Sequence, residues 1–133
     1  MILDQAYLGD LADQRESALE LAAELDGRPE PARVPSAVIW EAFTGVGNAF
    51  GEQSDALRAA YERLLASRSS IDLDPTVARR AGILNGEHLQ SDSVSDLDDV
   101  DSIVAAHALL LNEPVVSNDE DFQAVDGLDV VTY

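Results

Sequence analysis

The sequence predicts an α/β fold, in which a central parallel sheet of about four to five strands is covered by helices on both faces. Two observations lead to this prediction. Short apolar segments alternate with longer amphipathic segments along the whole chain, as in repeated strand–helix units. Acidic residues also follow apolar segments directly, as Asp4 follows Met1-Ile2-Leu3. We expect one domain over residues 1–133, because this length suffices for a hydrophobic core.

The predicted strands are short and mostly apolar. Pro114-Val115-Val116 is rich in β-branched residues, which favours an inner parallel strand. Residues 70–73 alternate polar and apolar side chains, which is typical of an edge strand. The expected strands are, in chain order, residues 1–3, 32–34, 70–73, 114–116 and 128–132.

The predicted helices are bounded by glycine, proline and small polar residues. Ser36 follows a proline and is the expected N-cap of the helix after the second strand. Gly45, Gly47 and Gly51 are expected to loosen the chain after that helix, and residues 90–96 are polar and predicted to form a loop. The expected helices begin near Tyr7 and at Ser36 and occupy residues 17–25, 54–66, 75–88 and 98–111, with a helical turn at 122–125.

The helix at 98–111 is the best supported of these elements. Its apolar positions recur with a helical period and define one face, made of Val100, Ile103, Val104, His107 and Leu111. Asp98 and Asp99 lie at the expected cap and first turn, where the helix dipole stabilises negative charge. The buried strand at 114–116 and a second acidic cluster follow this helix.

The chain is strongly acidic, with a net charge of −18 and a pI of about 4.1. All eight basic residues are arginine. Such a charge repels bare nucleic acid. It is explained either by a basic partner or by a salt-rich cell interior, where a Debye length of about 3 Å screens the repulsion. The acidic, lysine-free composition resembles that of proteins from salt-loving microbes. Because salt would screen the repulsion there, the net charge does not exclude RNA as a substrate.

Several functional classes lack support in the sequence. There is no cysteine, which excludes disulfides and thiolate chemistry. No apolar run approaches the roughly 18 residues of a membrane span, and the acidic start does not resemble a signal peptide. These features suit a cytoplasmic protein. No lysine follows the glycines as in a P-loop, and no nucleophile-elbow motif is present.

Four acids are expected to meet at one edge of the sheet. Asp4 and Asp119 each follow an apolar strand, and ligands of open α/β sheets bind at the carboxyl ends of strands. Glu41 and Asp101 lie on helices that flank these strands and can point to the same place. Crowded carboxylates bind protons unless a cation lies among them. Oxygen ligands of this kind suit Mg²⁺ or Mn²⁺.

The order of these segments resembles the PIN-domain family, and within it the VapC-type ribonuclease toxins. The resemblance covers nearly the whole chain. It is carried by Met1-Ile2-Leu3-Asp4, by Val34-Pro35-Ser36 leading to Glu41 and Gly45, and most strongly by residues 101–133. In that last part, Pro114-Val115-Val116-Ser117-x-Asp119-x-Asp121-Phe122 matches the C-terminal half of the family.

The resemblance implies an α/β/α sandwich and Mg²⁺- or Mn²⁺-dependent hydrolysis of RNA that leaves a 5′-phosphate. Asp4, Glu41, Asp101 and Asp119 match the acidic quartet that holds the metal and carries catalysis. Supporting positions are expected for Asp121, Ser117 and Asp98. The resemblance also implies a cognate antitoxin and a homodimer.

One departure from the family leaves a second reading open. These toxins usually carry threonine or serine after the first aspartate, whereas this chain has Gln5 and Ala6. The alternative is therefore a PIN-like protein-binding module with a weakened site. A third reading, a receiver-like signalling domain, requires a lysine near the acids, and the chain has none.

The remaining candidates are expected to have structural roles. His107 is predicted to lie hydrogen-bonded in the core and His88 on the surface, and two histidines alone do not support a zinc site. Trp40 is expected to pack against the protein or to contact a partner, and stacking on a nucleic-acid base is the less favoured alternative. RNA-binding residues are not identified, and the candidates are expected to be surface ion-pair partners: Arg33, Arg68, Arg79 and Arg80.

Overall fold

The computed structural model describes residues 1–92 and 97–133 and has a parallel five-stranded sheet at its centre. The strand order is β3-β2-β1-β4-β5. The strands are β1 (Ile2–Leu3), β2 (Arg33–Pro35), β3 (Ser69–Ile71), β4 (Val115–Val116) and β5 (Val130–Val131). All four strand pairings are parallel, so the predicted α/β architecture is confirmed.

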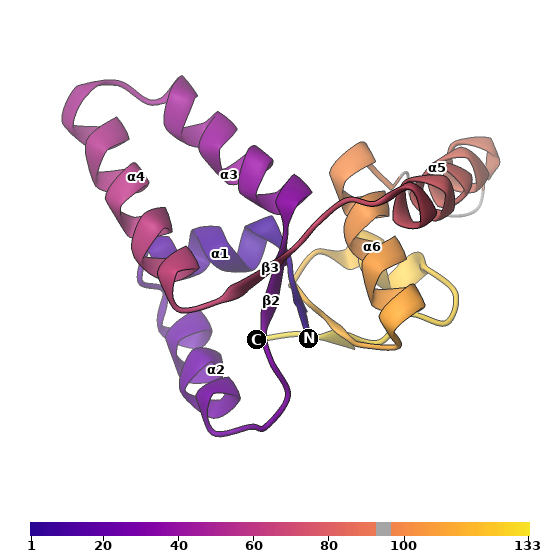
Figure 1. Cartoon of the computed structure of the whole chain (residues 1–133), viewed down its shortest axis with the longest axis horizontal. Coiled ribbons are helices and arrows are strands. Elements are labelled where there is room, and N and C mark those ends of the chain that lie inside the picture. Colours follow the sequence, from indigo (N-terminus) through magenta and orange to yellow (C-terminus); the bar gives the residue numbers. More distant parts are fainter. Residues whose placement is uncertain (93–96) are drawn as a thin grey trace.

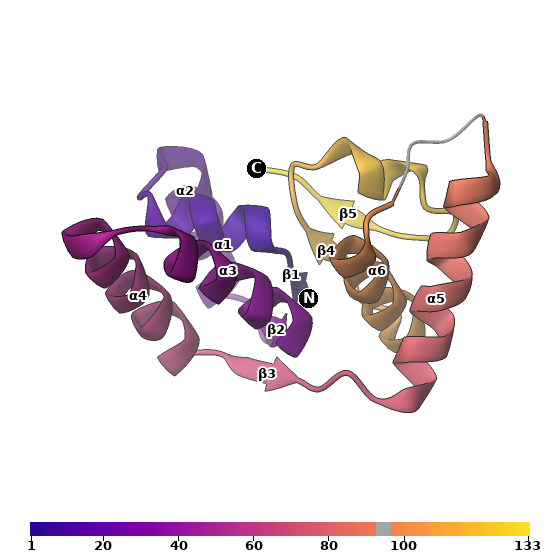
Figure 2. The same cartoon turned by 90° about the horizontal axis from the view of Figure 1, so that it is seen from above.

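Six α-helices flank the sheet within the described residues, and a short 3₁₀ helix follows β4. In Figures 1 and 2, α1 to α4 gather on one side of the strands, and α5 and α6 lie on the other. The helices are α1 (Gln5–Ala12), α2 (Glu16–Asp26), α3 (Ser36–Asn48), α4 (Gly51–Ala66), α5 (Pro75–Gln90), α6 (Asp99–Leu111) and the 3₁₀ helix η1 (Glu120–Ala124).

The inner strands are buried on both faces, as their β-branched composition predicts. Ile2, Leu3, Val115 and Val116 are all fully buried. Because β1 lies between β2 and β4, the residues that follow β1 and β4 leave the sheet next to each other. This adjacency brings together segments from the two ends of the sequence.

Helix α6 is buried around most of its circumference, so the single apolar face predicted from the sequence is too narrow. Ala105, Ala106 and Ala108 are buried as well as Val104, whereas Leu111 is 42% exposed at the end of the helix. The small alanine side chains let α6 pack closely against its neighbours on several sides. Asn112 ends the helix in the left-handed conformation, with φ of 52°.

Two predicted helix boundaries near α3 are wrong. Pro35, not Ser36, occupies the N-cap, and the Ser36 hydroxyl donates instead to Asp72 at 3.2 Å. Helix α3 continues to Asn48, so Gly45 and Gly47 lie inside it and do not loosen the chain. Gly51, with φ of +54°, lies at the turn where α4 begins, a conformation that favours glycine.

The loop predicted at residues 90–96 is only partly comparable with the structure. Gln90 is the last residue of α5, and residues 93–96 lie outside the described part of the chain. His88 was expected on the surface but is only 7% exposed, because it lies on the inward face of α5 with Ala81 and Leu84. His107 is buried as predicted, although its Nε2 lacks a hydrogen-bond partner among the described residues.

Candidate metal centre

The first part of the site lies where β1 and β4 end. Asp4 follows β1 directly, and Leu3 is paired with Val116 at the end of β4. This register places Ser117 beside Asp4, and its hydroxyl donates to the Asp4 carboxylate at 2.8 Å. The same hydroxyl oxygen accepts a bond from the backbone N–H of Asp119 at 3.0 Å. Fully buried Ser117 therefore links the two acids that the sequence predicts to be neighbours.

The second part of the site is the beginning of α6. The Asp98 side chain caps this helix by accepting a hydrogen bond from the backbone N–H of Asp101 at 2.8 Å. Asp101 lies in the first turn of the helix and is only 8% exposed. The cap thus fixes the backbone from which the most enclosed acid of α6 extends.

Three carboxylates come together where these two parts meet. Oxygen atoms of Asp101, Asp119 and Asp121 all lie within 4.8 Å of one another. The backbone N–H of Asp121 donates to the Asp119 carboxylate at 3.0 Å, which holds the turn that carries both residues. The sequence assigned Asp121 a supporting position, whereas the structure places it inside the closest group.

Glu41 reaches the neighbourhood of this group from α3. Its Oε2 atom is buried without a hydrogen-bond partner among residues 1–92 and 97–133. Burial raises the pKa of Glu41, and the negative charges of Asp4 and Asp98 raise it further. A buried carboxylate oxygen without a partner is costly, so this atom is suited to a ligand that the protein itself does not supply.

The electrostatics of the site favour a bound cation. Burial, followed by the charges of the surrounding acids, raises the pKa of Asp101 to about 8. Burial also raises the pKa of Asp4, although the Ser117 hydroxyl and the backbone N–H groups of Gln5 and Ala6 act in the opposite direction. Without a cation, these acids must retain protons or repel one another. The all-oxygen donor set fits a hard divalent ion.

Gln5 does not take part in this group. Its side chain turns towards α4, where its amide nitrogen lies 3.4 Å from the hydroxyl oxygen of Tyr61. The departure from the expected threonine or serine therefore leaves the Asp4–Ser117 bond in place. Ser117 supplies the hydroxyl contact that Gln5 lacks.

The predicted basic residues lie in different environments. Arg33 forms an ion pair with Glu113, as expected. Arg68 donates to the backbone oxygen of Leu64 at 2.7 Å and to the Ser67 hydroxyl at 3.2 Å. Trp40 is 66% exposed on α3.

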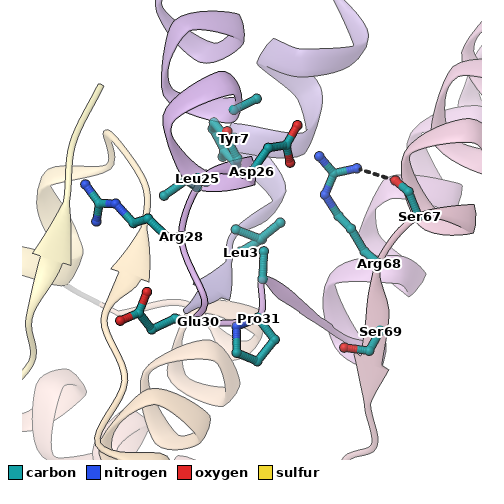
Figure 3. Close-up of a pocket in the computed structure, with 12 residues that line it drawn as sticks. Leu3, Tyr7, Leu25, Asp26, Arg28, Glu30, Pro31, Ser67, Arg68 and Ser69 are labelled. Carbon is teal, nitrogen blue, oxygen red and sulfur yellow. Dashed lines mark hydrogen bonds between the residues drawn. The ribbon is translucent and has the colours of Figure 1, made fainter.

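A cavity of about 400 Å³ lies beside α2, away from the acidic group. It is lined by mixed charges over an apolar floor that includes Leu3 and Leu25. Figure 3 shows Asp26 and Arg68 pointing towards each other across it. Because acidic and basic groups offset each other there, this cavity lacks the concentrated charge of the metal centre.

Two side-chain amides that were not predicted from the sequence support the acidic segments. Asn85 on α5 bonds to the residues that precede α6. Asn118 exchanges two bonds of 2.8 Å with the backbone of Tyr133, next to Asp119. Neither asparagine belongs to a periodic pattern, so the only available signal was the presence of an amide near an acidic cluster.

The fold and the site together define a class: parallel α/β domains with a carboxylate metal centre at the carboxyl edge of the sheet. Comparison with protein families identifies the family within this class. The model of the PIN domain matches residues 1–128, and the chain therefore belongs to the PIN-domain family. No curated protein sequence matches the chain significantly.

Solved structures with the same fold include several VapBC proteins. VapBC2 from Rickettsia felis, bound to a DNA fragment from its promoter, has a TM-score of 0.84 at 18% identity, over 99% of this chain and 97% of that chain. DNA-bound VapBC from Salmonella typhimurium has a TM-score of 0.81 at 18% identity, over 98% and 96%. VapC20 from Mycobacterium tuberculosis, described as a toxin that cleaves the sarcin–ricin loop, has a TM-score of 0.70 at 18% identity, over 92% of each chain.

Proposed function

We propose that this chain is a metal-dependent endoribonuclease and the toxin component of a VapBC-type toxin–antitoxin pair. The observation that carries the proposal is the group of three carboxylates within 4.8 Å of one another in a PIN domain. The similarity of the fold to VapC20, a toxin named for cleaving RNA, supports the same activity.

In this proposal, Asp101, Asp119 and Asp121 hold a Mg²⁺ or Mn²⁺ ion, and Asp4 and Glu41 complete its surroundings directly or through water. A bound divalent ion lowers the pKa of water and stabilises the negative charge that develops on a phosphodiester. Asp98 and Ser117 act one step further out, since each fixes the segment that carries a ligand.

The reaction is hydrolysis of an RNA phosphodiester. A water molecule attacks the phosphorus atom in line with the leaving oxygen, and the bond between phosphorus and the 3′ oxygen breaks. One product retains a 5′-phosphate and the other a 3′-hydroxyl. Glu41, whose pKa is raised by burial and by nearby negative charges, can accept the proton of the attacking water when it does not bind the metal. The departing 3′ oxygen takes up a proton from solvent water.

The proposal includes an antitoxin partner, a homodimer and a cytoplasmic location. Structures with this fold include a toxin–antitoxin complex from Klebsiella pneumoniae and VapBC-5 from Mycobacterium tuberculosis, which is described as a member of a family of toxin–antitoxin systems. A net charge of −18 also favours a basic partner. Within the described residues, no helix combines the length and apolar character needed to cross a bilayer.

The alternative, a weakened PIN-like binding module, rests on Gln5 and Ala6. The geometry gives it less support, because Asp4 keeps its bond to Ser117 and the three-carboxylate group is present. Loss of the hydroxyl after the first aspartate therefore does not dismantle the site.

The test is cleavage of total RNA by the purified protein in high KCl with Mn²⁺. We expect the parent to cleave and Asp101→Asn to be inactive, because the substitution removes an anionic ligand without changing its size. The matched control is Asp55→Asn, which makes the same change of charge at an exposed position on α4 and is expected to retain activity. No cleavage by a folded parent protein would support the binding-module alternative.

A further inference from the structure

Asn85 connects α5 to the beginning of α6. Its side-chain amide nitrogen donates to the backbone oxygen of Leu97 at 2.9 Å and lies 3.4 Å from a carboxylate oxygen of Asp99. Asn85 and Leu97 are twelve residues apart in the sequence. The hydrogen bond therefore joins α5 directly to the residues that precede α6.

The carbonyl group that Asn85 binds belongs to the residue directly before the cap of α6. The Leu97 side chain is 1% exposed and anchored in the core. The next residue, Asp98, caps Asp101 through its side chain, and its backbone oxygen accepts bonds from the hydroxyl and N–H of Ser102 at 2.6 and 2.9 Å. Two hydrogen bonds and the covalent link between Leu97 and Asp98 thus connect Asn85 to the backbone of Asp101.

Such a tether matters because the beginning of α6 carries several like charges. Asp98, Asp99 and Asp101 lie within four consecutive residues, and Asp98 is among the groups that raise the pKa of Asp101. Helix ends fray readily, and mutual repulsion of these carboxylates favours fraying here.

We propose that Asn85 is a positioning residue for the metal centre. Its neutral amide holds the first turn of α6 in the geometry that presents the Asp101 carboxylate to the ion. The inference rests on the proposed metal-dependent function, because it concerns a ligand of the same centre. The hydrogen bonds described for Asn85 go to Leu97 and Asp99, which are not members of the group of three carboxylates.

The test compares Mn²⁺ binding by calorimetry in the parent, Asn85→Asp and Asn85→Ala. In Asn85→Asp the donor is lost while size is kept, and a negative charge is added near the centre. If the residue acted only through charge, the variant would bind Mn²⁺ more tightly. The positioning role predicts the opposite, an affinity about tenfold or more weaker in both variants.

Three further measurements make the outcome decisive. Gln90→Ala removes an exposed amide from the same helix and is expected to leave affinity unchanged. Thermal unfolding confirms that each variant is folded at the temperature of titration, and Asn85→Ala serves if Asn85→Asp does not fold. Unchanged or tighter binding by the Asn85 variants would overturn the positioning role. Unchanged binding by Asp101→Asn would instead overturn the proposed metal centre itself.

Discussion

Asp101 is the residue whose protonation links metal binding to pH. Its pKa of about 8 reflects burial first and the neighbouring acids second. A carboxyl group with a raised pKa in the folded state binds more protons folded than unfolded. The free energy of unfolding of the metal-free protein therefore receives a contribution from Asp101 that is complete below its unfolded pKa near 3.8 and is lost as pH rises through about 8.

We expect the affinity for Mn²⁺ to increase as pH rises from 6 towards about 8, because the ion competes with the proton of Asp101. Calorimetry in buffers with different ionisation enthalpies should show proton release on binding at pH 6.5. In Asp101→Asn, any remaining binding should release fewer protons. An affinity that is constant over this pH range would contradict the assignment of Asp101 as a ligand.

At the scale of elements, η1 is the short segment that fixes the turn carrying Asp119 and Asp121. Phe122 directly follows Asp121 in the sequence and is fully buried in the core. Its ring holds a single helical turn whose own hydrogen bonds are too few to be stable alone. Packing by one aromatic residue therefore stabilises the geometry of two acids.

Phe122→Ala is expected to lower the free energy of unfolding by about 3–5 kcal/mol, because it leaves a cavity beneath η1. Phe50→Ala provides the control, since Phe50 is 87% exposed and its loss should change stability by less than about 0.5 kcal/mol. Chemical denaturation measures both values. Equal effects of the two substitutions would show that the packing around Phe122 is not as the structure describes.

The elements also show what sequence reasoning can reach. Strands β1 and β4 were predictable because each is a short apolar run followed by an acid. The surface position predicted for His88 was wrong, although the residue lies at helical spacing from Ala81 and Leu84 on the buried face of α5. Pro35 is the N-cap of α3 in place of the predicted Ser36, whose hydroxyl bonds instead to Asp72, a residue far away in the sequence.

The same limit applies to the metal centre. Asp4 and Asp119 were expected to lie near each other because parallel strands end at one edge of a sheet. The position of Asp121 beside Asp101 and Asp119 depends on the turn made by η1. The bond from Asn85 to Leu97 depends on how α5 packs against the beginning of α6. Both are tertiary features, which the pattern of hydrophobic residues does not encode.

At the scale of the whole molecule, the net charge of −18 acts on the stability of the folded state. A compact chain with 26 acids and eight arginines repels itself. Salt screens this repulsion, and the Debye length decreases from about 10 Å at 0.1 M to about 3 Å at 1 M.

We therefore expect Tm to rise by several degrees or more between 0.1 M and 2 M KCl, with most of the increase below about 1 M. Thermal unfolding followed by circular dichroism provides the measurement. Sucrose at matched water activity is the control for a general solvent effect. If sucrose raises Tm as much as KCl does, charge screening is not the cause.

The position of β1 between β2 and β4 has a consequence for synthesis of the protein. Asp4 is synthesised long before Asp119 and Asp121, which lie near the other end of the domain. A growing chain that ends at α6 has no partner for the free side of β1 and lacks two of the three clustered carboxylates. The three-carboxylate group can thus form only after the segment that contains Asp119 and Asp121 has been synthesised and has left the exit tunnel.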